Sequence, residues 1–107
     1  DLVARLPARF TASLRLQGVE TAAASDFLAA VQAAPAALMA AAGLGAVAAV
    51  DLTDGWRATD AGGQIVHLRA SGNAPEFRIY AEAGSVAHAD QIAARALAHV
   101  QRALGGV

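Results

Sequence analysis

The chain opens with a stretch in which apolar and polar positions alternate. Across residues 10–17 every second side chain is apolar, beginning with Phe10. A period of two with one apolar face is typical of a half-buried strand. Four later runs also predict strands, at residues 46–52, 56–59, 64–70 and 76–83. The first two separators among them are short and contain glycine, which predicts hairpins and therefore an antiparallel meander.

The segment after the first strand carries the 3.6-residue period of an amphipathic helix. Ser25 is its expected N-cap, with Asp26 in the first turn. Pro35 either kinks this helix or opens a second short one, and Gly43 is the expected stop. The apolar stripe is expected to comprise Phe27, Leu28, Val31 and Leu38.

Residues 85–104 predict a final helix with Ser85 as its cap. Its expected buried stripe comprises Ala89, Ile92, Ala93, Ala96, Val100 and Leu104. Its expected solvated face comprises His88, Gln91, Arg95, His99 and Arg102. The spacing of the two histidines does not suit one metal ion, so both are expected to be solvated.

The element order is therefore β-α-β-β-β-β-α. An antiparallel sheet with one apolar face needs a cover, and the amphipathic helices can supply it. We expect a single α+β domain over residues 1–107, built as two layers: a mostly antiparallel sheet of four or five strands with the helices on one face.

Composition narrows the possible functions. The 107 residues contain no cysteine, which excludes disulfides and thiolate metal sites and is compatible with a cytoplasmic location. A net charge of −1 argues against a nucleic-acid partner. The longest apolar stretch, residues 33–50, contains a proline and two glycines and argues against a membrane span. The chain begins at Asp1 rather than methionine, so we expect it to be a piece of a longer protein.

The candidate chemistry lies between the last two predicted strands. Arg69 ends one strand and Arg78 lies early in the next, and the loop between them contains Ser71, Gly72 and Asn73. Guanidinium groups match phosphate with two-pronged donor geometry, and a glycine lets backbone N–H groups approach an anion. Spacing alone leaves two interpretations open: a phosphate-binding loop, or a hairpin loop flanked by arginines.

A resemblance to a known family favours the first interpretation. Residues 54–57 (Asp-Gly-Trp-Arg) and 68–83 (Leu-Arg-Ala-Ser-Gly-Asn-Ala-Pro-Glu-Phe-Arg-Ile-Tyr-Ala-Glu-Ala) resemble the last domain of the α-D-phosphohexomutases, of the bacterial phosphomannomutase/phosphoglucomutase type. That family carries Arg-x-Ser-(Gly or Asn)-Thr-x-Pro, usually with an arginine in the next strand. Residues 6–13 also resemble the domain's first strand. Asn73 and Ala74 depart from the family's usual Thr and Glu, which leaves sugar selectivity open.

The resemblance implies a fold and a role. The fold would be the TATA-box-binding-protein-like C-terminal domain of these isomerases, which interconvert hexose 1- and 6-phosphates. Arg69, Ser71, Gly72, Asn73 and Arg78 would hold the non-transferred phosphate as the domain closes over the sugar. The catalytic phosphoserine, the Mg²⁺ loop and the hexose 1,6-bisphosphate activator would belong to the other domains, so this piece alone is expected to be inactive.

The remaining candidate residues indicate a function less specifically than this loop does. His67 shares a strand face with Arg69 and lies either near the bound sugar phosphate or simply at the surface. Trp56 is expected to pack in the core or against a neighbouring domain. The alternative function is a small non-catalytic interaction or regulatory module with an anion-binding loop, because α+β folds of this kind serve many roles.

Overall fold

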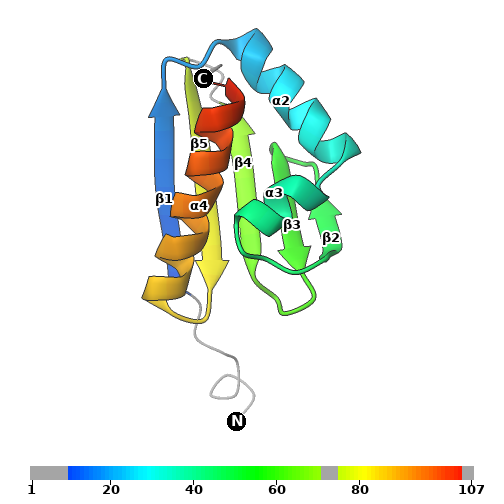
Figure 1. Ribbon diagram of the computed structural model, residues 1–107, viewed down its shortest axis with the longest axis vertical. Helices are drawn as coiled ribbons and strands as arrows, with labels where there is room; N and C mark the ends of the chain where they lie inside the picture. The colour runs from blue at the N-terminus through cyan, green and yellow to red at the C-terminus, as the bar shows by residue number, and fades with distance from the viewer. Residues whose placement is uncertain (1–9, 71–74, 105–107) are drawn as a thin grey trace.

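The structure of the 107-residue chain is a computed structural model, and it describes residues 10–70 and 75–104 (Figure 1). Five strands form one sheet in the order β1-β5-β4-β3-β2, with every neighbouring pair antiparallel. The strands are β1 (Phe10–Gln17), β2 (Val47–Asp51), β3 (Trp56–Asp60), β4 (Ile65–Ala70) and β5 (Glu76–Ala83). The α+β fold class and the predicted strands are confirmed, with shifts of one residue at some ends.

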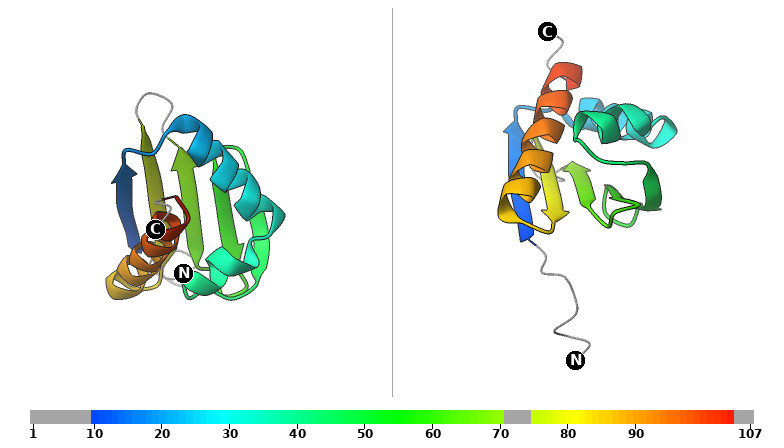
Figure 2. Two further views of the ribbon diagram at one scale, coloured as in Figure 1. Left: turned by 45° about the horizontal axis from the view of Figure 1, so that its top comes forward. Right: turned by 60° about the horizontal axis from the view of Figure 1, so that its bottom comes forward.

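Three helices cover one face of this sheet (Figures 1 and 2). They are α2 (Thr21–Ala33), α3 (Ala36–Ala41) and α4 (Val86–Leu104). Helix α4 lies along β1 and β5, while α2 and α3 lie over the side of the sheet formed by β4, β3 and β2. The sheet therefore has one covered face and one open face.

The core lies between the two layers. Trp56, Leu68 and Phe77 contribute large buried side chains from three neighbouring strands, and Ile92 and Val100 of α4 meet them from the helical layer. The ring of Phe27 in α2 packs edge-on against Phe77, with centroids 5.8 Å apart. Burial of such aromatic and aliphatic side chains is the main force that holds the layers together.

Two sequence predictions about helix boundaries meet different outcomes. The first helix begins at Thr21 rather than at Ser25, and its N-cap position, Glu20, makes no side-chain capping bond. The Ser25 cap was therefore wrong: Ala24 is buried, and the apolar stripe extends the helix by a turn toward β1. Ser85 does cap α4, because its hydroxyl oxygen accepts a hydrogen bond from the His88 N–H at 3.1 Å.

Pro35 separates two helices instead of kinking one. It occupies the N-cap position of the six-residue helix α3, where its missing N–H costs no helical bond. Gly43 follows that helix with φ of +79°, which only glycine adopts freely, so the predicted stop is confirmed.

The link from β1 to α2 and the β2–β3 turn lie at one end of the sheet (Figure 1). Strand β4 ends and strand β5 begins at that same end. At the opposite end lie the β3–β4 turn and the link from β5 to α4. We call the first end, which carries the last residues of β4 and the first residues of β5, the loop end.

Candidate functional site

Three arginines stand side by side across the open face at the loop end. In the strand register, Arg15 of β1 lies opposite Arg78 of β5, and Arg78 lies opposite Arg69 of β4. Like charges directly opposite one another on a sheet are unfavourable unless acids neutralise them. The three side chains, here called the arginine row, therefore mark a place where the fold gathers positive charge.

Two of these arginines share one carboxylate. Glu76 begins β5 and is only 9% exposed. Its carboxylate accepts a hydrogen bond from Arg78 Nε at 2.8 Å and forms an ion pair with Arg15 Nη1 at 3.6 Å. The bond to Glu76 raises the pKa of the Arg78 guanidinium. Arg78 is thus held along the sheet by its neighbouring acid.

Arg69 pairs with a different acid. Its Nε lies 3.1 Å from Asp54 Oδ1, and Asp54 belongs to the β2–β3 turn. Both side chains remain substantially exposed, at 43% for Arg69 and 58% for Asp54. The guanidinium of Arg69 is therefore oriented by the protein while staying accessible to a ligand.

A second row crosses the same face two residues further from the loop end along each strand. Ser13, Tyr80, His67 and Arg57 follow one another in register from β1 to β3. The His67 ring packs against the Tyr80 ring with centroids 5.5 Å apart, and His67 Nε2 is hydrogen-bonded to the main-chain oxygen of Asp54. His67 is thus a structural contact of the turn that carries Asp54, which the sequence did not indicate.

Two shallow hollows line this open face. One, of about 300 Å³, is lined by Ser13, Leu14, Arg15, Arg78 and Tyr80. The other, of about 240 Å³, is lined by Thr11, Arg57, Ile65, His67, Tyr80, Ala81 and Glu82. The open face offers hydroxyl, guanidinium and imidazole groups, whereas the covered face is apolar.

Part of the site predicted from the sequence lies within the described residues, and part lies outside them. Arg69, near the end of β4, lies opposite Arg78, near the start of β5, at the loop end. Ser71, Gly72 and Asn73 lie outside the described residues. Two residues after Asn73, the carbonyl of Pro75 accepts hydrogen bonds from the N–H groups of Gly18 and Val19, at 2.7 and 2.9 Å. The link from β1 to α2 is thus hydrogen-bonded to the residue that precedes β5.

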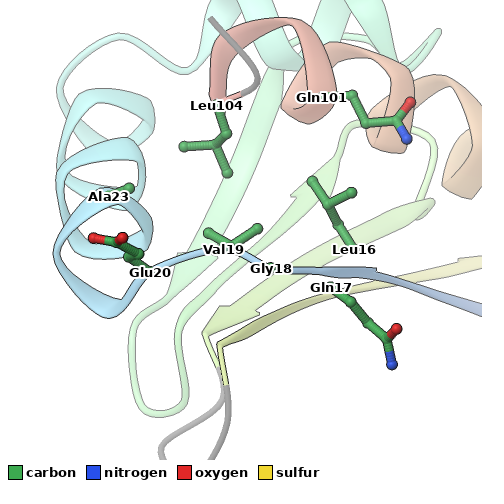
Figure 3. Close-up of a pocket in the computed structure, with 8 residues that line it drawn as sticks. All are labelled: Leu16, Gln17, Gly18, Val19, Glu20, Ala23, Gln101 and Leu104. Carbon is green, nitrogen blue, oxygen red and sulfur yellow. The ribbon is translucent and has the colours of Figure 1, made fainter.

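A third hollow, of about 520 Å³, adjoins that link (Figure 3). Its lining residues are Leu16, Gln17, Gly18, Val19, Glu20, Ala23, Gln101 and Leu104. Aliphatic side chains from β1, α2 and α4 dominate it, and its one charged group is an acid. This chemistry suits an apolar contact and not a phosphate, so the hollow is separate from the arginine row.

The described part of the chain contains neither a metal-ligand cluster nor a membrane-spanning helix. Within residues 10–70 and 75–104, no group of three or more His, Asp or Glu side chains lies close enough to hold a metal ion. None of the described helices combines the length and apolar character that crossing a bilayer requires.

Sequence reasoning missed three participants: Asp54, Arg15 and Glu76. The alternation in residues 10–17 already placed Arg15 on the polar face of the first strand, but only the β1–β5 register brings it opposite Arg78. Glu76 and Arg78 are two residues apart in one strand and therefore share a face, which was a signal available in the sequence. The pairing of Asp54 with Arg69 depends on how the β2–β3 turn folds.

Comparison with known proteins bears on the family to which the chain belongs. Residues 16–99 match the model of the family described as "Phosphoglucomutase/phosphomannomutase, C-terminal domain". Over 107 aligned residues, 98% of this chain, the sequence is 36% identical to a phosphomannomutase of Salmonella muenchen, of which it covers 22%. It is also 49% identical over 55 residues, 51% of the chain, to 12% of a phosphomannomutase of Sinorhizobium fredii.

The chain thus spans about a fifth of the length of the first of these relatives and aligns with it almost from end to end. The arrangement of five antiparallel strands under helices, and the matched segment that includes both Arg69 and Arg78, fit one conclusion. The chain belongs to the family of C-terminal domains of phosphoglucomutases and phosphomannomutases.

Proposed function

We propose that the chain is the domain of a phosphohexomutase that closes over a hexose phosphate and holds the phosphate that is not transferred. The observation that carries this proposal is the arginine row: three guanidinium groups in adjacent register, with Arg69 and Arg78 flanking the segment that contains Ser71, Gly72 and Asn73. The relatives named phosphomannomutase support it.

The chemistry of the row favours a phosphate over other ligands. Guanidinium groups offer paired N–H donors that match two phosphate oxygens. Glu76 neutralises part of the charge of Arg15 and Arg78, and its burial keeps it away from an incoming anion. We assign the direct contact to Arg69, because its pairing with Asp54 engages Nε and because it lies two residues before Ser71 in the chain.

Holding a phosphate away from the reacting oxygen contributes to catalysis by orienting the sugar. In this proposal the phosphoryl transfer itself, with its Mg²⁺ and its hexose 1,6-bisphosphate, takes place on the other domains of a longer chain. The residues described here bind the phosphate and orient the sugar, and they take no part in proton transfer.

The isolated domain is expected to bind weakly. Each well-made charge-assisted hydrogen bond contributes about 1.5–3 kcal/mol, but water competes in an open site and immobilising the ligand costs several kcal/mol. A dissociation constant of the order of 1 mM follows, which corresponds to about −4 kcal/mol.

An NMR titration of the chain with mannose 6-phosphate tests the proposal. We expect the amide signals of residues 69–75 to shift, and Arg69→Ala to weaken binding more than tenfold. Arg57→Ala is the matched control, because Arg57 lies on the same open face with similar exposure (41%) and pairs with Glu82. Arg57→Ala should change the affinity less than twofold, and mannose without phosphate should cause no shifts at residues 69–75. Equal losses in the two variants, or shifts confined to α4, would contradict a phosphate site at Arg69.

A further inference from the structure

The β2–β3 turn lies in close contact with the end of β4. Gly55 has φ of +84°, and a Cβ atom built on it would lie 2.2 Å from the main-chain oxygen of Leu68. A side chain at this position would collide with the backbone of β4. The absence of one lets the turn lie directly against the residue that precedes Arg69.

Three bonds fix the turn in that position. The carboxylate of Asp51 accepts a hydrogen bond from the Thr53 N–H at 2.8 Å, which shapes the turn from within. The Thr53 side chain, and then this N–H, lower the pKa of Asp51. The main-chain oxygen of Asp54 is hydrogen-bonded to His67 Nε2. Because a carbonyl oxygen only accepts, Nε2 carries the proton. The third bond is the ion pair between Asp54 and Arg69.

We propose that Asp54 is a positioning residue that holds the guanidinium of Arg69 ready for a phosphate. The inference rests on the proposed function and adds to it a residue that touches Arg69 and not the ligand. The Asp54 carboxylate engages Nε at 3.1 Å. The two terminal nitrogens of the guanidinium are then the pair that meets the anion.

An aspartate beside an anion site has two opposing effects. Ordering a long arginine side chain in advance lowers the entropy lost on binding, which strengthens binding. The negative charge of the carboxylate repels a phosphate, which weakens binding. A single substitution of Asp54 mixes the two effects, so the test has to separate them.

Two variants accomplish the separation. Asp54→Asn and Asp54→Ala both remove the charge, and only the asparagine retains an oxygen that can accept the Arg69 Nε–H. Their difference therefore reports positioning alone. We expect the alanine variant of the chain to bind mannose 6-phosphate about threefold more weakly than the asparagine variant. The corresponding pair at Asp90, an exposed acid of α4 on the covered side of the sheet, should show no difference.

A second readout needs no ligand. In the free chain, the Arg69 Nε–H signal should exchange with water more slowly in the wild type and in Asp54→Asn than in Asp54→Ala. If Asn and Ala give the same affinity and the same exchange rate, the positioning role is wrong. Since Asp54 is 58% exposed, neither variant should prevent folding, and a circular dichroism spectrum checks this.

The outcomes distinguish the two proposals. If the wild type does not bind mannose 6-phosphate but Asp54→Ala still accelerates exchange at Arg69 Nε–H, the positioning of Arg69 stands and the phosphate-binding function is wrong. If the wild type binds and the Asn and Ala variants do not differ, the phosphate-binding function stands and the positioning role is wrong.

Discussion

The two turns that flank β3 each carry an aspartate, and the two carboxylates bind different partners. The β3–β4 turn, at the end opposite the loop end, folds around a buried acid: Asp60 is 6% exposed and its carboxylate accepts the N–H groups of Gly45, Gly62 and Gln64 at 2.9–3.1 Å. The β2–β3 turn, at the loop end, carries its acid outward to Arg69. One carboxylate satisfies backbone donors, and the other orients a side chain.

The difference assigns a stabilising role to Asp60 and a binding role to Asp54, although both lie in turns next to β3. Buried N–H groups need acceptors, so Asp60 holds the hairpin and the α3–β2 connection together. An exposed ion pair such as Asp54 with Arg69 adds only about 0.2–1 kcal/mol to stability. We therefore expect substitutions of Asp60 to lower the free energy of unfolding and substitutions of Asp54 mainly to change ligand binding.

The largest expected effect is at Asp60. Asp60→Ala leaves three backbone donors without their acceptor, and the free energy of unfolding should fall by about 3 kcal/mol. Asp60→Asn keeps one accepting oxygen for the N–H groups of Gly62 and Gln64, so it should cost about half as much. Urea denaturation measures both, and Asp54→Ala serves as the comparison with a loss under about 1 kcal/mol. Equal losses at Asp60 and Asp54 would break the contrast between the turns.

The next effect compares two glycines with the same backbone conformation. Gly55 and Gly63 both have φ of +84°, but a Cβ at Gly63 meets no atom within 4 Å. Gly63→Ala should therefore cost only the conformational strain, about 1–2 kcal/mol. Gly55→Ala adds a collision with the Leu68 oxygen and should cost at least about 1 kcal/mol more.

The same pair of variants also sharpens the functional side of the comparison. Gly55→Ala should displace Asp54 from Arg69 and weaken binding of mannose 6-phosphate, while Gly63→Ala should bind as the wild type does under conditions where both are folded. Loss of binding in both variants, or in neither, would show that the β2–β3 turn has no special connection with Arg69.

Much of this architecture follows from the sequence because its signals are local. The alternation of residues 10–17 and the glycine turns between the later strands gave the five-strand sheet, and the stripe from Ala89 to Leu104 gave α4. The predicted N-cap at Ser25 was wrong, because the Ala and Thr residues before it are compatible with a helix and the helix begins at Thr21. Here the packing of the buried Ala24 outweighs the capping preference of Ser25 and adds a turn to the helix.

The candidate site was less accessible from sequence. Arg69 and Arg78 could be named because they flank one loop. Arg15 and Asp54 lie 54 and 15 positions before Arg69 in the chain, and only strand register and the close approach of Gly55 bring them there. His99 was expected to be solvated. Instead it is partly buried, and its ring centroid lies 6.2 Å from that of Phe27.

The smallest expected effect uses His99 to weaken the helical layer without touching either turn. Partial burial lowers the pKa of His99 below its ordinary value of 6.5, and the positive charge of Arg102, one helical turn away, lowers it further. The unfolded chain therefore takes up a proton at a higher pH than the folded chain does. Stability is fully present above about pH 6.5, and it falls as the pH drops through the lowered value.

The melting temperature of the wild type should accordingly decrease between pH 7.5 and pH 5, and His99→Gln should reduce that decrease. Arg102→Gln should raise the pKa of His99 and also reduce the pH dependence, because it removes a like charge. An NMR titration of the His99 ring signals measures the pKa directly, and a value at or above 6.5 would contradict the assignment. Because His99 lies in the covered layer, the difference in stability between the Asp60 and Asp54 variants should persist across this pH range. If acid abolished that difference, the two turns would not be independent of the helical layer.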